Sequence, residues 1–292
     1  MAATMRQWAR YASWLLPQGV HVLRSRMHSL KATVEYVSRE TLAANSELKN
    51  RHQGQRCFIV GNGPSVKQQD LRSLRGETVF SVSNGYLHEG YEAMAPKYHC
   101  VPQITYGRMT QEDVVKWFSE MHEHLGGAEL FLNETEAAVV KKHRLFAGRK
   151  VHYIALRENF DELNGTAVID IARPVPRVES VPVMVLMIAM YLGFREIVIL
   201  GVDHDSWRTG HYSYAFDVKV VANKDPSVTS SGNILTPNYD TFQSLARLWR
   251  QYRHLATIAA ANDINVFNAG IGGELDEFVR CPLDSLVSRA SC

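Results

Sequence analysis

The chain contains few cysteines, and none of them stands in a closely spaced pair. The four are scattered over 292 residues, at Cys57, Cys100, Cys281 and Cys292. This spacing excludes a zinc site built from paired cysteines. Two of the four fall in strand-like apolar runs, where a cysteine is usually a buried free thiol. Such usage fits a reducing, cytoplasmic compartment.

A long apolar run and a strong net charge are also absent. No apolar stretch reaches the roughly 18 residues of a transmembrane helix, so none is expected. Residues 1–20 are interrupted by Arg6 and Arg10 and do not make a good secretory signal. The net charge of +2 argues against a strong nucleic-acid binder. The 292 residues, 46% of them hydrophobic, suffice for one large α/β domain plus appendages.

Residues 1–34 contain no acidic residue, which sets them apart from the rest of the chain. We expect residues 1–50 to form a basic amphipathic helical arm. Its apolar seam from Val20 to Val37 steps by three and four residues but is too short to define a coiled coil. One interpretation is contact with anionic lipid at the inner face of the cell membrane. The other is packing on the domain or on a second subunit of a homo-oligomer.

From residue 51 to residue 292, strand-like runs alternate with helical patterns. The expected strands are Cys57–Val60, Thr78–Ser83, Tyr98–Val101, Ala128–Leu132, Val151–Ala155, Glu196–Gly201 and Ile264–Asn268, and the expected helices are Gln111–Leu125, Pro182–Leu192 and Thr241–Asn262. This alternation predicts an α/β domain with a single doubly wound, mostly parallel, Rossmann-like sheet. Ligands of such sheets lie outside the carboxyl ends of the strands.

A glycine-rich turn follows the first expected strand. Gly61, Asn62 and Gly63 end that strand, and Pro64 and Ser65 then offer the start of a helix. Glycine permits a sharp turn and a close approach to a ligand, and a helix N-terminus attracts anions. The pattern is neither the dinucleotide fingerprint nor a Walker loop. A ligand-binding turn and a purely structural turn both fit it.

Two further segments fall on the same edge of the predicted sheet. Asn84 follows the second strand, and residues 201–205 follow the sixth. After them, residues 205–240 form a long segment rich in Ser, Gly, Asn and aromatic residues. An aromatic loop of this length after a strand favours a lid that closes over a ligand.

Asp203 and Asp205 form an Asp-x-Asp pair after an apolar strand. Two carboxylates at this spacing can hold a divalent cation against a diphosphate. Alternatively, Asp203 hydrogen-bonds the neighbouring turn while Asp205 is solvated. His204 lies between these two residues, and His211 follows Asp205 at the start of the predicted lid. Both are candidate general bases, because an imidazole titrates near neutral pH.

Other candidate ligand-binding residues flank the lid and the helix that begins near residue 182. Tyr212 and Tyr214 could donate hydrogen bonds to a departing phosphate. Arg177 could bind a carboxylate or a phosphate in a fork, with Arg173 as the competing candidate. The Ser180 hydroxyl suits either capping of the helix or contact with an anion.

Three motifs occur in order along the chain. They read Phe58-Ile-Val-Gly-Asn-Gly-Pro-Ser65, Leu192-Gly-Phe-Arg-Glu-Ile-Val-Ile-Leu-Gly-Val-Asp203 and Ser213-Tyr-Ala-Phe-Asp217. Together they resemble the bacterial sialyltransferases of glycosyltransferase family 42, over roughly residues 55–283. The third motif is the most specific, because it lies inside the predicted lid. The resemblance implies an inverting transferase that needs no metal and takes CMP-sialic acid as donor.

The resemblance also implies roles for individual residues. The Gly-Asn-Gly turn (Gly61, Asn62, Gly63) and Asn84 would bind the CMP-sugar. Ser180, within a residue or so, would hold the sugar carboxylate. Tyr214 would stabilise the leaving phosphate, and a second tyrosine of the family falls near Trp207. The family's general base, a histidine in the second half of the lid, has no counterpart between Gly232 and Asp240.

A second resemblance concerns the two ends of the domain. The Gly-Asn-Gly-Pro-Ser start and the segment Asn268-Ala-Gly-Ile-Gly-Gly-Glu-Leu-Asp-Glu-Phe278 are similar to the pterin diphosphokinase-like proteins. The leading hypothesis is a metal-independent glycosyltransferase that moves an acidic sugar from a CMP-activated donor to a bacterial surface glycan, without a cofactor. One alternative is a diphosphokinase that uses ATP and magnesium. Another is an inactive nucleotide-binding adaptor.

Overall fold

The computed structural model describes residues 37–102, 110–160, 167–211, 213–216 and 236–287. The chain divides into two compact units, residues 1–35 and 36–292, and every described residue belongs to the second. The seam from Val20 to Val37 lies almost wholly outside the described residues, so its membrane and oligomer interpretations stay predictions. None of the described helices combines the length and the apolar character that crossing a membrane requires.

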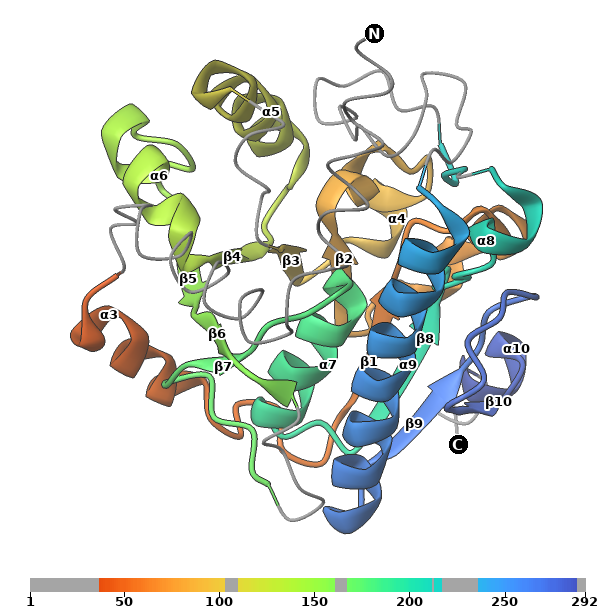
Figure 1. Cartoon of the computed structure of the whole chain (residues 1–292). Helices are drawn as coiled ribbons and strands as arrows, with labels where there is room; N and C mark the ends of the chain where they lie inside the picture. Colours follow the sequence, from red (N-terminus) through yellow and green to blue (C-terminus); the bar gives the residue numbers. More distant parts are fainter. Residues whose placement is uncertain (1–36, 103–109, 161–166, 212, 217–235, 288–292) are drawn as a thin grey trace, which may run out of the picture. The chain divides into compact units, whose positions relative to one another are not determined.

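The centre of the second unit is a parallel sheet of eight strands (Figure 1). Its strands are β1 (Arg56–Val60), β2 (Val79–Val82), β3 (Tyr98–Val101), β4 (Glu129–Asn133), β5 (Val151–Ile154), β8 (Glu196–Leu200), β9 (Asn265–Asn268) and β10 (Val279–Arg280). Their spatial order is β10-β9-β8-β1-β2-β3-β4-β5. The predicted doubly wound sheet is therefore confirmed. Two short strands, β6 (Leu156–Glu158) and β7 (Val175–Pro176), pair separately.

Helices cover both faces of the sheet. They are α3 (Arg39–Ala43), α4 (Tyr91–Met94), α5 (Gln111–His124), α6 (Ala137–His143), α7 (Val181–Tyr191), α8 (Ser206–Thr209), α9 (Asn238–Ala261) and α10 (Leu283–Val287). Successive side chains of a strand point to opposite faces. In β1, Cys57 and Ile59 join the core under α7 and α9, whereas Phe58 and Val60 join the core that contains α5 and α10. The domain thus has three layers.

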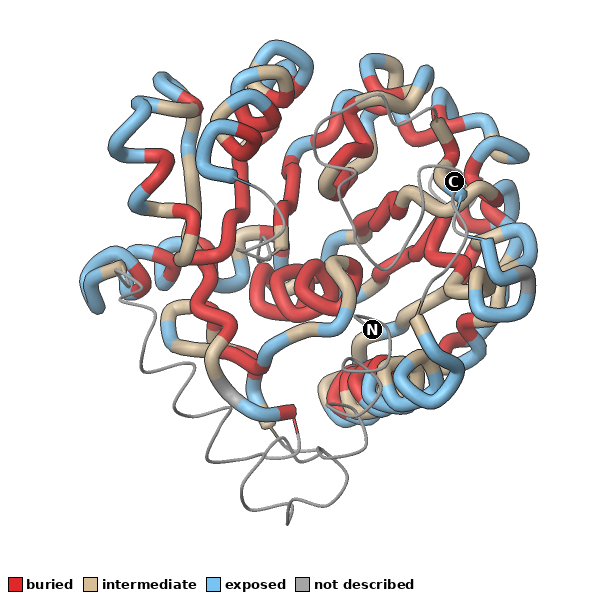
Figure 2. Tube along the Cα trace, turned by 45° about the horizontal axis from the view of Figure 1, so that its top comes forward, coloured by how far each residue is buried: buried red, intermediate tan, exposed pale blue. Residues whose placement is uncertain are grey.

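Helix α7 is apolar on every side, and ten of its 11 residues are buried. A helix with this composition is stable only inside a protein, because it has no polar face to turn to water. It lies between the sheet and α9, and buried residues, red in Figure 2, fill this central region. Its N-terminal end is therefore fixed relative to the carboxyl edge of the sheet.

The described part of the predicted arm packs on the sheet domain. In the 3-10 helix η1 (Ala44–Leu48), the buried Asn45 donates from Nδ2 to the carbonyl oxygens of Tyr153 and Ile171 at 2.8 and 2.9 Å. Four further 3-10 helices follow, η2 (Pro64–Gln68), η3 (Leu71–Leu74), η4 (Ser83–Leu87) and η5 (Glu134–Glu136). The helix start expected at Pro64 is thus only a short 3-10 helix, which offers a ligand less than an α-helix N-terminus would.

Candidate functional site

The chain reverses its direction of winding at β1. From β1 it runs outward through β2, β3 and β4 to β5, then returns to β8 on the other side of β1 and continues to β9 and β10. Ligands of doubly wound sheets bind at the carboxyl ends of the strands flanking such a reversal. A cavity of about 180 Å³ lies there, which we call the edge pocket. The predicted residues on its wall are Gly61, Asn62, Gly63, Pro64, Asn84, Ser180, Asp203, His204 and Tyr214.

Gly61 and Gly63 bring the turn after β1 against the turn after β8. A Cβ on Gly61 would lie 2.3 Å from the carbonyl oxygen of Gly201, and one on Gly63 would lie 2.5 Å from Oδ2 of Asp203. Neither glycine has a positive φ. The sequence suggested that these glycines let a ligand approach the backbone closely. In the structure, their missing side chains make room for the turn after β8 instead.

Asp203 holds the start of η2 in place. Its carboxylate accepts hydrogen bonds from the backbone N–H of Ser65, at 2.9 Å, and from the Ser65 hydroxyl. Both residues are buried, and Ser65 lies behind the pocket wall rather than on it. Of the two interpretations of the Asp-x-Asp pair, the structure therefore shows the hydrogen bond to a turn. Within the described ranges, no three His, Cys, Asp or Glu side chains converge on a metal position.

Asn62 and Asn84 line the pocket with their amide groups held in opposite senses. Asn62 donates from Nδ2 to the carbonyl oxygen of Val82 at 3.1 Å, which leaves Oδ1 as an acceptor. The Oδ1 of Asn84 accepts from the indole N–H of Trp117 at 2.7 Å, which leaves the NH₂ group as a donor. A partner on one amide atom decides how the whole amide lies. The pocket therefore offers one fixed acceptor and one fixed donor.

Ser180 precedes α7 but does not cap it. Its side chain makes no hydrogen bond to the first turn of the helix and instead lies close enough to the hydroxyl of Tyr252 to influence the pKa of that group. The capping role expected for Ser180 is therefore wrong. In the first turn of α7, Pro182 has no N–H group and the Val183 N–H donates to the carbonyl of Ser180 at 3.1 Å, so the N–H of Val181, which lines the pocket, is the group left without a side-chain cap. The end of this 11-residue helix attracts an anion.

His204 lies on the pocket wall in a strained backbone conformation, with a φ of 50°. Its Nε2 lies 2.8 Å from the hydroxyl oxygen of Tyr252. Burial lowers the pKa of His204 to about 4. The imidazole is therefore neutral at pH 7 and a weak proton acceptor, which disfavours it as a general base.

Tyr214 reaches the pocket from the predicted lid. The next residue, Ala215, donates its backbone N–H to the carbonyl oxygen of Asn62 at 2.9 Å. The ring of Tyr214 stacks on Phe216, with the ring centroids 5.8 Å apart. These contacts fix Tyr214 beside the Gly-Asn-Gly turn. Tyr212 and residues 217–235 of the lid lie outside the described residues.

Four other predicted residues do not line the edge pocket. Arg177 lines a neighbouring cavity, and its competitor Arg173 lines another one. Trp207 on α8 is 39% exposed, and its ring packs edge-on against Phe242. His211 is exposed and lies away from the pocket wall. The structure therefore gathers the turn, strand-end and helix-end residues, but not these four.

Sequence reasoning missed the residues that support the pocket from behind. Besides Trp117 and Tyr252, the buried His99 on β3 donates from Nε2 to the carbonyl oxygen of Ser83 at 3.0 Å, while its Nδ1 accepts from the Ser81 hydroxyl at 2.7 Å. Ser83, on the pocket wall, has a φ of 47°. Burial lowers the pKa of His99 to about 3, so this support stays neutral. For Trp117 and Tyr252, the only sequence signal was one polar atom on an otherwise apolar side chain.

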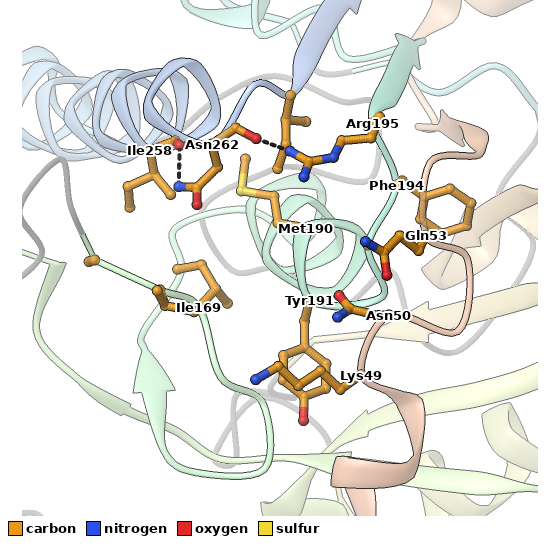
Figure 3. Close-up of a pocket in the computed structure, with 14 residues that line it drawn as sticks. Lys49, Asn50, Gln53, Ile169, Met190, Tyr191, Phe194, Arg195, Ile258 and Asn262 are labelled. Atoms are coloured by element: carbon orange, nitrogen blue, oxygen red, sulfur yellow. Dashed lines mark hydrogen bonds between the residues drawn. The ribbon is translucent and has the colours of Figure 1, made fainter.

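A second cavity, of about 140 Å³, lies at the opposite edge of the sheet, beside the C-terminal end of α7 (Figure 3). There, Arg195 donates to the backbone carbonyl of Asn262, and the Asn262 side chain donates to the carbonyl of Ile258 at 2.8 Å. The backbone N–H of Asn50 donates to the carbonyl of Tyr191 at 3.1 Å. The guanidinium group of Arg195 and the backbone N–H of Asn50 therefore hold the chain segments around this cavity together.

No family model matches the chain, and no curated protein matches its sequence. Among solved structures, the chain is similar to the sialyltransferase CstII from Campylobacter jejuni in complex with cytidine-5'-monophosphate. The identity is 18%, the match covers 78% of this chain and 85% of that one, and the TM-score is 0.47. A CST-II complex with a trisaccharide acceptor and CMP matches with 18% identity over 77% and 85% of the two chains, at a TM-score of 0.46. Likeness of this degree concerns the fold alone, so the function has to be argued from the site.

Proposed function

We propose that the protein is an inverting glycosyltransferase that moves an acidic sugar from a CMP-activated donor to a bacterial surface glycan. The observation that carries this proposal is the edge pocket's fixed acceptor on Asn62 and fixed donor on Asn84, beside the uncapped end of α7. A cytosine base presents an amino donor next to ring and carbonyl acceptors, which complements that pair. The three motifs resembling family 42 lie at this pocket.

The remaining groups of the pocket suit the charged part of such a donor. The first turn of α7 and the Ser180 hydroxyl would hold the sugar carboxylate. The Tyr214 hydroxyl would donate a hydrogen bond to the leaving phosphate, which stabilises its charge without a metal. The described wall otherwise consists of backbone, amide and hydroxyl groups, apolar side chains, the His204 imidazole and two carboxylates, without a lysine or an arginine. These groups suit a nucleoside monophosphate sugar better than a triphosphate.

We propose that Asp205 is the general base that takes the proton of the acceptor hydroxyl. It lines the pocket, whereas Asp203 is engaged by Ser65 and His204 has a pKa of about 4. In an inverting transfer, the acceptor hydroxyl attacks while a base takes its proton, and a carboxylate can fill that role. This assignment replaces the two histidines expected from the sequence.

The alternatives predict different ligands. A diphosphokinase needs ATP and magnesium, and Asp203 could not bind the metal without sharing oxygens that already accept from Ser65. An inactive adaptor would bind CMP without turnover. A thermal-shift panel with CMP, CTP and ATP, each with and without magnesium, separates these functions. We expect stabilisation by CMP alone and release of CMP from CMP-sialic acid; stabilisation by ATP with magnesium only would overturn the proposal.

A further inference from the structure

A cavity of about 340 Å³ lies beside the edge pocket and carries an unusual number of arginines. Four guanidinium groups line it, from Arg157 at β6, Arg177 after β7, and Arg247 and Arg250 on α9. Glu179 and Gln251 belong to the same wall. We call this cavity the arginine pocket. The four arginines are far apart in the sequence, and only the fold brings them together.

One guanidinium group of the arginine pocket has no ion pair within the described ranges. Arg247 pairs with Glu179 at 2.7 Å, and Arg157 pairs with Glu134, whose side chain is only 2% exposed and lies behind it. For Arg177, the described part of the chain provides no ion-pair partner. The guanidinium group of Arg177 therefore carries a positive charge that an anion from solution would neutralise.

The wall of the arginine pocket is already ordered. Gln251, which is 7% exposed, accepts at Oε1 from the backbone N–H of Glu179 at 2.9 Å and donates from Nε2 to the carbonyl of Arg177 at 3.1 Å. The carbonyl of Arg177 and the N–H of Glu179 are therefore both hydrogen-bonded to α9. Because this segment is held before any ligand arrives, binding costs less conformational entropy.

The same segment separates the arginine pocket from the edge pocket. Ser180, which lines the edge pocket, follows Glu179 directly, and Tyr252, which its side chain approaches, follows Gln251. A molecule that reaches a sugar in the edge pocket would therefore extend past residues 177–180 towards the arginines. Arg177, expected from the sequence to hold the donor, belongs to this second cavity.

We propose that the arginine pocket binds an anionic group, a carboxylate or a phosphate, on the acceptor glycan. This inference rests on the proposed transferase function. Guanidinium forks match both oxyanions, since each presents two coplanar oxygens to parallel N–H groups. The acceptor would then be an acidic or phosphorylated saccharide rather than a neutral one.

The test measures KM for acceptors that differ only in charge. The acceptors are a methyl galactoside, the corresponding galacturonide and the galactoside 6-phosphate, with CMP-sialic acid as donor. We expect the charged acceptors to have the lower KM, and the Arg177→Gln and Arg250→Gln variants to raise it about tenfold for these acceptors only. Arg253→Gln is the matched control, because Arg253 lies on α9 but pairs with Glu277 outside the arginine pocket. The carboxylate and phosphate arms decide which oxyanion is preferred.

Equal KM values for neutral and charged acceptors, or an equal effect of Arg177→Gln on both, would overturn the inference. A second measurement does not need turnover: inorganic phosphate is titrated at constant ionic strength in the presence of CMP, with the melting temperature as readout. Stabilisation that disappears in Arg177→Gln but not in Arg253→Gln supports the arginine pocket even where no sugar is transferred. Equal stabilisation of both variants, or none of the wild type, contradicts it. Absence of CMP binding would instead count against the proposed function.

Discussion

The cavities at the two edges of the sheet differ in what holds their amide side chains. At the carboxyl edge, the Asn62 amide donates to the carbonyl of Val82 and the Asn84 amide accepts from the indole of Trp117, so each amide is held by a different segment of the chain. At the amino edge, the Asn262 amide donates to the carbonyl of Ile258, four residues earlier on its own helix. The difference is that the amides of the edge pocket are oriented by other segments of the fold, whereas the Asn262 amide at the amino edge only continues its own helix.

The largest expected effect removes the proposed base at the carboxyl edge. Asp205→Asn should lower the rate of sugar transfer by about a hundredfold or more, because general base catalysis contributes about that much. The transfer rate is measured with saturating donor and acceptor. Asp284→Asn, at an exposed position of α10, is the control and should leave the rate unchanged. A rate for Asp205→Asn within a factor of three of wild type would refute the assignment.

A pair of glycine substitutions compares the packing of the two edges. Gly61→Ala should lower the free energy of unfolding by about 3 kcal/mol, because its Cβ would meet the Gly201 backbone. Gly54→Ala, near the amino edge, should cost about 1 kcal/mol for its φ of 78°, since a Cβ there meets nothing within 4 Å. Urea unfolding of both variants measures the difference. Equal losses would mean that the turn after β1 tolerates a side chain.

The buried histidines make the stability depend on pH. The pKa of His204 is about 4 in the folded protein, against 6.5 as its ordinary value. Between these pH values the unfolded chain binds a proton that the folded protein does not, so the free energy of unfolding falls as pH falls. Between pH 7.0 and 5.5, His204→Asn should lose about 1 kcal/mol less than wild type. An identical loss in both proteins would show that His204 is accessible to protons.

The smallest effect concerns the orientation of an amide. Trp117→Phe removes the indole N–H that fixes Asn84, so the affinity for CMP should fall about fivefold, as for the loss of one neutral hydrogen bond. Trp249→Phe is the matched control, because its indole makes an equally short bond, 2.7 Å, to Asp276 outside the edge pocket. Isothermal titration of CMP into both variants measures the difference. An affinity unchanged by Trp117→Phe would mean that Asn84 does not contact the nucleotide.

The central strands and long helices were predictable because each is an apolar run or a helical period long enough to recognise. Strands of two or three residues, such as β7 and β10, carry no periodicity and were missed. The candidate residues Gly61, Asn62 and Asn84 were predictable because carboxyl ends of parallel strands meet at one edge, and Ser180 because it stands just before an apolar helix. The polar tips of Trp117 and Tyr252 were not, since both residues count as apolar in a helical pattern.

The arginine pocket illustrates a different limit. Arg157, Arg247 and Arg250 are ordinary surface residues in the sequence, where a single arginine on a helix is usually solvated. They line one cavity with Arg177 only because the chain after β7 returns to lie beside α9. The prediction that Arg177 binds a carboxylate or a phosphate remains open, but its place is next to the edge pocket rather than in it.

The pairing of β1 with β8 has a consequence for synthesis of the protein. Arg56 lies beside Glu196 in the sheet, so the central strand of the fold must wait for some 140 further residues to be translated before its second neighbour exists. At about 5–20 residues per second, that interval lasts on the order of ten seconds. During it, β1 is an apolar strand with one open edge, which can pair with other chains. We therefore expect a ribosome-bound chain that stops before residue 196 to be a substrate for chaperones.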